Sequence, residues 1–525
     1  MKKSFLHKSL FLLMALALIC VPRTALAAED ATDLSGKKLV SDSKGFKSIN
    51  GMFDKVERSG ASASGKEEVF LTLTAEEGIG SLYLIFNQEG ITATVTDNDT
   101  GTVHTPEAPF FYHQYLDIAG IFGHTPTSVT LNFGKQAVKL NELYAYTAGE
   151  VPATVQKWET PAEGKTDLLM LCAHGDDDQI FFAGVLPHYA VNLGYRVQVV
   201  YLTDHHNFEQ YRIHEMMDGL WAAGVKTYPL FGNYPDYTFK SPEQASVHYG
   251  KIQYAYNHFD RYGFTREQML GFVVEQLRRF DPKVAVTHDF NGEYAHSHHM
   301  VCADLMAEAV QISMDATVYP ESAESYGVWD VPKTYIHLYE QNPIRLDLDT
   351  PLDCFGGLSA FEVSKEVAFP MHKSQYKAVS RFINPYPNAA EMKYSPSEYG
   401  LYRSTVGEDV QKDDFFENVL THDQQARKEE EERLAEEARL AEEARLAEEA
   451  RRAEEARQVE EARKAEEARL AEEARKAEEA HLAAEAEQLA REKQQRNIRI
   501  ALAGGVGGCL AVVLLILLKC RKKRK

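Results

Sequence analysis

The sequence predicts an α/β domain with a mainly parallel sheet, preceded by an all-β sandwich and followed by one long helix. Three observations predict this order. Short strand-like runs alternate with turn signals up to about residue 150, apolar runs alternate with helical stretches over about 163–417, and a six-residue repeat fills 427–496. A chain of 525 residues is also too long for a single core, so several folded units are expected.

Residues 33–150 are expected to form the all-β sandwich or jelly roll. The runs are short, apolar and evenly spaced, for example 69–73 and 81–86, and turn residues separate them. Three consecutive aromatic residues lie among them: Phe110, Phe111 and Tyr112. Sandwich modules often bind sugars, and these rings could stack on a sugar. Such runs more often pack in a core, so both interpretations stay open.

The α/β domain is expected at 163–417. Apolar strands are predicted at 168–171, 196–202 and 284–286, and helices at 208–223 and 265–280. Strands that alternate with helices form right-handed units around a mainly parallel sheet. Ligand sites in such sheets lie beyond the carboxyl ends of the strands, which is where functional residues are sought.

The segment 427–496 is a charged repeat in which Arg-Leu-Ala-Glu-Glu-Ala recurs from Arg433 onward. Six residues advance a helix by about 240°, so the leucines wind around it and form no heptad seam. Glu at i+3 and i+4 from each Arg stabilises the helix from within. The composition resembles that of a coiled coil, but the pattern predicts a single solvated helix of roughly 100 Å, a stalk.

Both ends of the chain carry membrane-related signals. Residues 1–27 combine basic residues, a short apolar stretch and Ala25-Leu26-Ala27, as in a signal peptide. An uncharged apolar run at 500–518 is long enough to cross a bilayer, and a basic tail, 519–525, follows it. We therefore expect a single-pass membrane protein with its domains outside and its tail in the cytoplasm. Signal, stalk and anchor together suggest the surface of a Gram-positive bacterium.

Charge and cysteine content exclude some classes of protein. The net charge of the chain is -21, much of its acid lies in the Glu-rich repeat, and no basic face suits nucleic acid. Outside the leader and the apolar C-terminal run, the cysteines are Cys172, Cys302 and Cys354. An odd number does not make a disulfide framework, so free, buried thiols are expected.

A first polar cluster follows the strand at 168–171: Ala173-His174-Gly175-Asp176-Asp177-Asp178. Imidazole and carboxylate groups suit Zn²⁺, and neighbouring carboxylates on a turn can point in different directions. The same aspartates could instead cap a helix N-terminus. This motif alone leaves both possibilities open.

A second cluster follows the strand at 284–286 in the same way. It reads Thr287-His288-Asp289-Phe290-Asn291-Gly292-Glu293-Tyr294-Ala295-His296-Ser297-His298-His299. Three histidines within four residues, at the carboxyl end of a second strand, would face the acidic cluster of the first. The two clusters together predict a metal site.

The pair AHGDDD and NGEYAHSHH resembles the PIG-L (N-acetylglucosaminyl deacetylase, LmbE-like) family, whose signatures run approximately AHPDDE and NGxYGHxxH. The resemblance covers roughly 165–380 and implies a Rossmann-like fold. It includes an Arg212/Glu215 pair that opens a helix and a late segment that begins Met371-His372. This chain departs from the signatures at Gly175, Asp178 and Ala295, and none of these departures removes a ligand.

The resemblance implies a Zn²⁺-dependent de-N-acetylase and assigns its residues. The zinc ligands would be His174, Asp177 and His299. Asp176 would be the general base, His296 the acid that protonates the leaving amine, and Tyr294 would polarise the amide carbonyl. Arg212, Asp236 and His372 would contact the substrate. The role of His298 would be to support the site or simply to pack in it.

The expected partner is an N-acetylated amino-sugar glycan or glycoconjugate of the N-acetylglucosamine type. Two alternatives remain: a sugar-binding surface protein of adhesin type without turnover, and a zinc amidohydrolase that removes another acyl group. For Arg212 the alternative is a surface ion pair with Glu215 or Glu209. The oligomeric state is left open.

Overall fold

The computed structural model describes residues 30–520, except 162, 205–210 and 237–248, and leaves out the side chains of 204 and 503–520. The leader expected at 1–27 and most of the basic tail lie outside these residues. The chain divides into two compact units, residues 1–425 and 426–525. Each unit is described by itself.

The N-terminal part of the first unit is a sandwich of two antiparallel sheets, as the sequence predicts. One sheet has the order β1-β3-β8-β5-β6 and the other β2-β9-β4-β7. The strands are β1 (Val40–Lys44), β2 (Ala61–Ala63), β3 (Val69–Thr74), β4 (Ser81–Phe86), β5 (Thr94–Asp97), β6 (Val103–His104), β7 (His113–Leu116), β8 (Ser128–Gly134) and β9 (Val138–Tyr146), with one short helix, α2 (Ile118–Phe122).

Buried and partly exposed side chains alternate along the strands, and the buried ones form the core of the sandwich. In β3 the side chains of Val69, Leu71 and Leu73 are buried while the intervening ones are partly exposed, as a half-buried strand requires. The inward-facing residues of both sheets form one apolar cluster.

The three consecutive aromatic residues pack inside the protein. Phe110 and Tyr112 are buried, and Phe111 stacks on Tyr228 of the α/β domain with ring centroids 4.0 Å apart. The packing interpretation of this run is therefore the right one, and a sugar-stacking surface built on it is excluded.

The second part of this unit is an α/β domain around a seven-stranded sheet of order β12-β11-β10-β13-β14-β16-β15. Its strands are β10 (Leu168–Cys172), β11 (Val197–Asp204), β12 (Leu230–Pro235), β13 (Val284–Thr287), β14 (Lys333–His337), β15 (Pro343–Arg345) and β16 (Glu398–Ser404). The first five in the order are parallel, and β16 and β15 continue the sheet antiparallel. The sheet is mainly parallel, as predicted.

Helices pack on both faces of this sheet. They are α3 (Asp177–Ile180), α4 (Tyr211–Ala222), α6 (Ile252–Arg261), α7 (Arg266–Phe280), α8 (Ser297–Ile312), α9 (Pro320–Tyr326), α10 (Ala360–Glu362) and α11 (Lys373–Val379). Along β10, Leu168 and Met170 join one apolar cluster while Leu169 and Leu171 join the other. A strand buried on both faces reads as a continuous apolar run, which is why the sequence locates β10 so closely.

Buried polar contacts join the sandwich to α4. His214 of α4 lies 2.9 Å from His113 of β7 through their ring nitrogens and 3.0 Å from the amide nitrogen of Asn141 in β9. The phenol of Tyr228 accepts a hydrogen bond from the backbone N–H of Tyr112. The sandwich therefore packs as part of the first unit rather than as a separate module.

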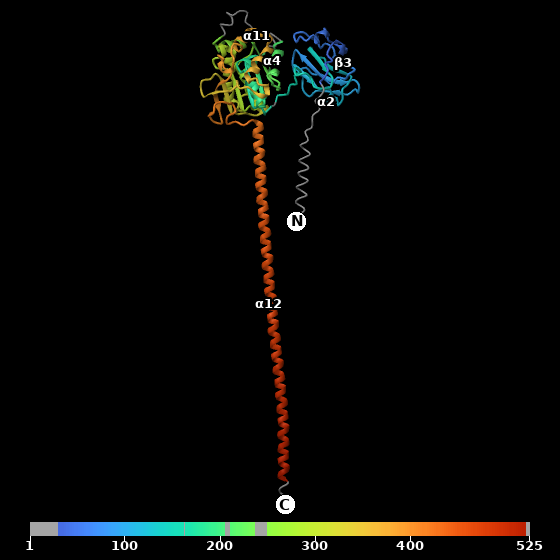
Figure 1. The fold of residues 1–525 in the computed structure, drawn as a ribbon, viewed down its shortest axis with the longest axis vertical. Coiled ribbons are helices and arrows are strands. Elements are labelled where there is room, and N and C mark those ends of the chain that lie inside the picture. Colours follow the sequence, from blue (N-terminus) through green and yellow to red (C-terminus); the bar gives the residue numbers. More distant parts are fainter. Residues whose placement is uncertain (1–29, 162, 205–210, 237–248, 521–525) are drawn as a thin grey trace. The chain divides into compact units, whose positions relative to one another are not determined.

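The second unit consists of the long helix α12 (His422–Cys520), whose first turn lies in the first unit (Figure 1). The side chains described in its charged repeat are mostly exposed, and ion pairs such as Arg433–Glu430 (2.6 Å) recur at i,i+3 and i,i+4. The predicted helical repeat is confirmed.

Among the residues that the structure describes, no helix is long and apolar enough to cross a membrane. The expected span at 500–518 falls largely on side chains outside that part of the chain, so the anchor stays a prediction.

The three cysteines expected outside the leader and the apolar run are free. Cys172 and Cys302 are buried, as predicted, but Cys354 is exposed, which corrects the expectation for that residue. Cys354 lies in a short 3-10 turn, Asp353–Phe355, on the surface of the α/β domain.

Candidate metal centre

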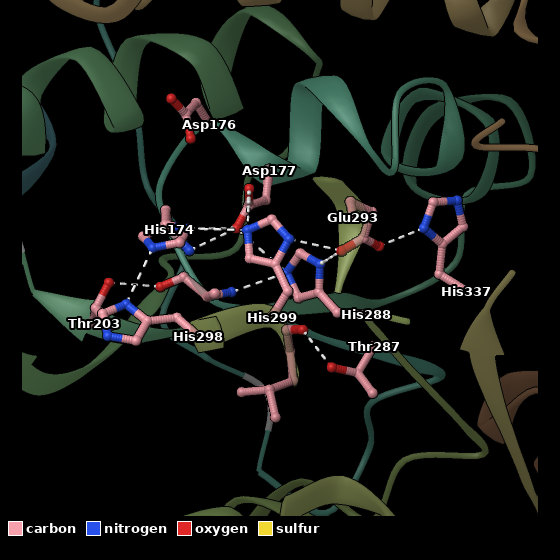
Figure 2. A network of polar contacts seen from close by, with 12 residues as sticks. His174, Asp176, Asp177, Thr203, Thr287, His288, Glu293, His298, His299 and His337 are labelled. Carbon is pink, nitrogen blue, oxygen red and sulfur yellow. Dashed lines mark hydrogen bonds and ion pairs between the residues drawn. The ribbon is translucent and has the colours of Figure 1, made fainter. Parts of the chain in front are cut away.

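The two polar clusters meet because their strands are neighbours. β10 pairs in parallel with β13, with Leu171 opposite Thr287, so the segments that follow both strands emerge at the same edge of the sheet. The first segment leads into α3 and the second into α8. Figure 2 shows the side chains of both segments directed toward one another.

Three side chains converge at the centre of this edge. Nδ1 of His174 lies 3.1 Å from Oδ2 of Asp177 and 3.2 Å from Nε2 of His299, and that Nε2 lies 3.3 Å from Oδ1 of Asp177. Zinc bonds of about 2.0–2.1 Å at tetrahedral angles separate ligand atoms by about 3.3 Å. The spacing and chemistry of this His174–Asp177–His299 trio therefore fit a zinc ion.

Neighbouring residues offer overlapping donor sets. Ligand atoms of His174, His296 and His299, of His174, Asp236 and His298, and of Asp177, His288 and His299 each lie within 4.8 Å of one another. The expected trio combines members of the first and third sets. The structure thus brings all the predicted ligands together. It adds His288 as a further possible ligand, a residue to which the sequence analysis assigned no role.

The electrostatics of the trio favour a cation. Although burial opposes a charge on His174, Asp236 and Asp177 raise the pKa of this imidazole to about 10. Burial likewise opposes ionisation of Asp177, yet His299 and His174 hold the pKa of this carboxyl well below its usual range. Two acidic groups thus attract positive charge to the point where the donors converge, and a metal ion can supply it.

A buried carboxylate that sequence reasoning missed lies behind the trio. Glu293 Oε2 is 2.6 Å from Nδ1 of His299 and 2.8 Å from Nδ1 of His288, and Oε1 is 2.5 Å from Nδ1 of His337 (Figure 2). Glu293 and His288 belong to the second motif. His337 ends β14, a strand that the sequence did not predict.

Asp176 stands apart from the trio in Figure 2. Arg212 of α4 donates from Nη2 to Oδ2 of Asp176 over 3.4 Å, and both residues are buried. Arg212 is therefore buried and not on the helix surface, and Glu215 accepts hydrogen bonds from Ser374. Glu209, the other partner considered for Arg212, lies outside the described residues. Burial raises the pKa of Asp176 above its usual value, and the nearby Arg212 opposes this rise.

His296 and Tyr294 lie beside the trio. The ring of His296 is 4.6 Å from that of His174 and 4.7 Å from that of His299, measured between centroids. Burial and these two imidazoles hold the pKa of His296 well below its usual range, so it rests neutral and can accept a proton before it donates one. Burial raises the pKa of Tyr294 well above 10, which keeps its phenol a hydrogen-bond donor.

The structure places the other expected residues around this centre. Asp236 Oδ1 lies 3.4 Å from Nε2 of His174 and 3.4 Å from Nδ1 of His298, so Asp236 belongs to the site itself. His298 is fully buried and stacks on Phe259, which agrees with a supporting role. His372 is buried against Gly219 of α4, and burial, with Arg212 nearby, lowers its pKa to about 3.

The three departures from the family signatures lie in different surroundings. At Gly175 an added Cβ would overlap the side chain of Met216, which occupies this space. Asp178 is buried and accepts a hydrogen bond from Gln179, and burial raises its pKa to about 8. Ala295 has a φ of 63°, a left-handed conformation that glycine adopts without strain.

A mainly parallel α/β sheet with a buried trio of two imidazoles and a carboxylate at its carboxyl edge has the donor set of a metal-dependent hydrolase. Residues 169–310 form a domain of the PIG-L family, described as GlcNAc-PI de-N-acetylase. This domain contains both motifs and the whole trio.

Known proteins are similar to this chain over part of its length. A 1D-myo-inositol 2-acetamido-2-deoxy-alpha-D-glucopyranoside deacetylase 2 of Saccharopolyspora erythraea is 36% identical over 70 residues, which are 13% of this chain and 24% of that protein. The chain thus spans about a quarter of the length of this relative.

Solved structures are similar at low identity. The N,N'-diacetylchitobiose deacetylase from Pyrococcus horikoshii has a TM-score of 0.31 at 16% identity, over 45% of this chain and 84% of that one. A conserved protein from Thermus thermophilus has a TM-score of 0.30 at 15% identity, over 47% of this chain and 96% of that one.

Proposed function

We propose that the first unit is a zinc-dependent de-N-acetylase that hydrolyses the N-acetyl group of N-acetylglucosamine-type sugars in a glycan or glycoconjugate. The observation that carries this proposal is the tetrahedral spacing of the ligand atoms of His174, Asp177 and His299, with Asp176 and His296 nearby. The names of the family and of the deacetylases to which the chain is similar agree with it.

The bound zinc would lower the pKa of a water molecule and stabilise negative charge on the acetyl oxygen. His174, Asp177 and His299 would hold it. All other steps of the reaction fall to the protein's own side chains.

Asp176 takes the proton of the attacking water, because its raised pKa makes it a stronger base than an exposed carboxylate. Arg212 holds this carboxylate in place through Oδ2. Tyr294, neutral at all working pH values, donates a hydrogen bond to the acetyl carbonyl oxygen. The proton that Asp176 removes from water passes through His296 to the amine nitrogen as the C–N bond breaks, which restores both side chains.

The setting of this reaction is proposed to be outside the cell. The leader at 1–27, the helical repeat and the apolar run at 500–518 together describe an exported enzyme held at the membrane by a stalk. Its substrate would then be an external N-acetylated glycan or glycoconjugate.

The test is acetate release from N-acetylglucosamine oligomers by the purified full-length chain, with added zinc and after chelation. Release that stops on chelation and returns with zinc supports the proposal. Zinc bound in a one-to-one complex without release from any N-acetylated sugar would reject the de-N-acetylase and favour another acyl group.

A further inference from the structure

Glu293 has a position in this fold that its place in the motif does not suggest. It lies in the short 3-10 turn Glu293–Ala295 with its side chain completely buried. Its carboxylate faces three imidazoles, which come from α8 (His299), the segment after β13 (His288) and the end of β14 (His337). The family signature NGxYGHxxH leaves this position open, so the arrangement belongs to this chain's own residues.

The hydrogen-bond partners of Glu293 indicate which ring nitrogens of His299 and His288 carry hydrogen. Oε2 of Glu293 lies within hydrogen-bonding distance of Nδ1 of both His299 (2.6 Å) and His288 (2.8 Å). A carboxylate oxygen that two ring nitrogens approach in this way accepts a hydrogen bond from both. His299 and His288 therefore both donate from Nδ1 to Oε2, which leaves Nε2 of each ring as the atom that faces the metal centre.

The Nε2 atoms of His299 and His288 face different parts of the metal centre. Nε2 of His299 faces Nδ1 of His174 at 3.2 Å, where the zinc ion is expected. Nε2 of His288 accepts the backbone N–H of Ala173, the residue before His174, at 3.1 Å. One carboxylate thus orients a ligand on α8 and, through His288, the segment that carries the other two.

The third imidazole anchors the carboxylate itself. Nε2 of His337 lies 2.9 Å from the backbone carbonyl oxygen of Ser395, which only accepts, so this nitrogen carries hydrogen. Nδ1 of His337 lies 2.5 Å from Oε1 of Glu293. His337 thereby ties Glu293 to the segment before β16, and the side chain has little freedom to turn.

We propose that Glu293 is the positioning residue of the metal centre: it sets the tautomer and ring orientation of His299 and, through His288, the position of the His174 segment. This inference rests on the proposed function, because it assumes that the trio binds zinc. Partners of this kind typically change metal affinity by about 10–100-fold when they are lost.

Two substitutions separate the contributions of charge and hydrogen bonding. Glu293→Gln keeps one oxygen for His288 and His299 but loses the negative charge, so the dissociation constant for zinc should rise about tenfold. Glu293→Leu removes every acceptor and should raise it about 100-fold. Glu362→Gln is the matched control, because this carboxylate accepts the backbone N–H of Ser359 at the start of α10, and an amide oxygen can replace it.

The experiment uses the full-length chain, with zinc as the probe in competition against a chelating dye, and the absorption spectrum of the cobalt-loaded protein. Graded losses of affinity with altered cobalt bands support the inference. The inference would be overturned if both Glu293 variants had a zinc dissociation constant within about twofold of that of Glu362→Gln and showed unchanged cobalt bands. A parent chain that binds no zinc would overturn it as well.

A measurement on the unsubstituted chain covers the case in which a variant does not fold. Long-range ¹H–¹⁵N correlations of histidine-labelled protein should show His299 with hydrogen on Nδ1 and none on Nε2, and the reverse tautomer would overturn the inference. Since neither affinity nor tautomer depends on turnover, a chain that binds zinc but releases no acetate refutes the proposed function alone.

Discussion

Replacing the proposed general base is the sharpest test of the chemistry. Asp176→Asn keeps the size of the side chain and an oxygen that can accept from Arg212, but it removes the basic carboxylate. A positioned general base contributes about 10²–10⁴-fold to the rate. The activation free energy should therefore rise by about 2.7–5.5 kcal/mol, with a matching fall in kcat. Zinc content should not change, because Asp176 stands apart from the trio.

Asp178→Asn is the matched control for this substitution. Asp178 is also buried and lies two residues away, but its pKa of about 8 leaves it protonated at pH 7, where an amide resembles it closely. The assay is initial acetate release at saturating substrate, together with zinc content by elemental analysis. Asp176→Asn that keeps more than about a tenth of the parent rate would refute the assignment of the base.

Three further changes test the site and the packing around it. His299→Ala should lose bound zinc while His298→Ala keeps it, and the opposite result in metal analysis would move the ligand to His298. Gly175→Ala should lower the free energy of unfolding by about 1–3 kcal/mol, because the new methyl group overlaps Met216; Met216→Ala in the same chain should recover part of the loss in thermal denaturation. Burial raises the pKa of Glu142 to about 7, so the folded state is favoured while this carboxyl is protonated and loses that stabilisation as pH rises through 7. The Tm of Glu142→Gln minus that of the parent should therefore be more positive at pH 8 than at pH 5. An equal Tm difference at both pH values would contradict burial as the cause of the raised pKa.

The metal trio could be predicted from the sequence because its members follow the apolar strands at 168–171 and 284–286. Such strands are recognisable when both of their faces are buried, and parallel neighbours bring their carboxyl ends together. The strand β14 could not be recognised in this way. It reads Lys-Thr-Tyr-Ile-His, and its buried Lys333 is paired with Asp409, which lies 76 residues further along the chain.

His337 was missed for the same reason, since a single histidine at the end of an unrecognised strand carries no signal. Glu293 was visible within its motif, but the direction of its carboxylate depends on a turn in which Tyr294 and Ala295 both have positive φ. Local sequence preference opposes that turn. Tertiary contacts, here the buried hydrogen bonds to imidazoles on three elements, hold it instead.

The contacts of α4 change the interpretation of the sandwich. Residues 33–150 suggest a separate binding module, yet His113 and Asn141 both contact His214 in the interior. His214 lies between Arg212, which holds Asp176, and Glu215, which accepts from Ser374. Because buried polar groups that lose their partners cost about 1–3 kcal/mol each, removing the sandwich would destabilise the helix that positions the base. The sandwich is thus part of the structure that supports the candidate metal centre.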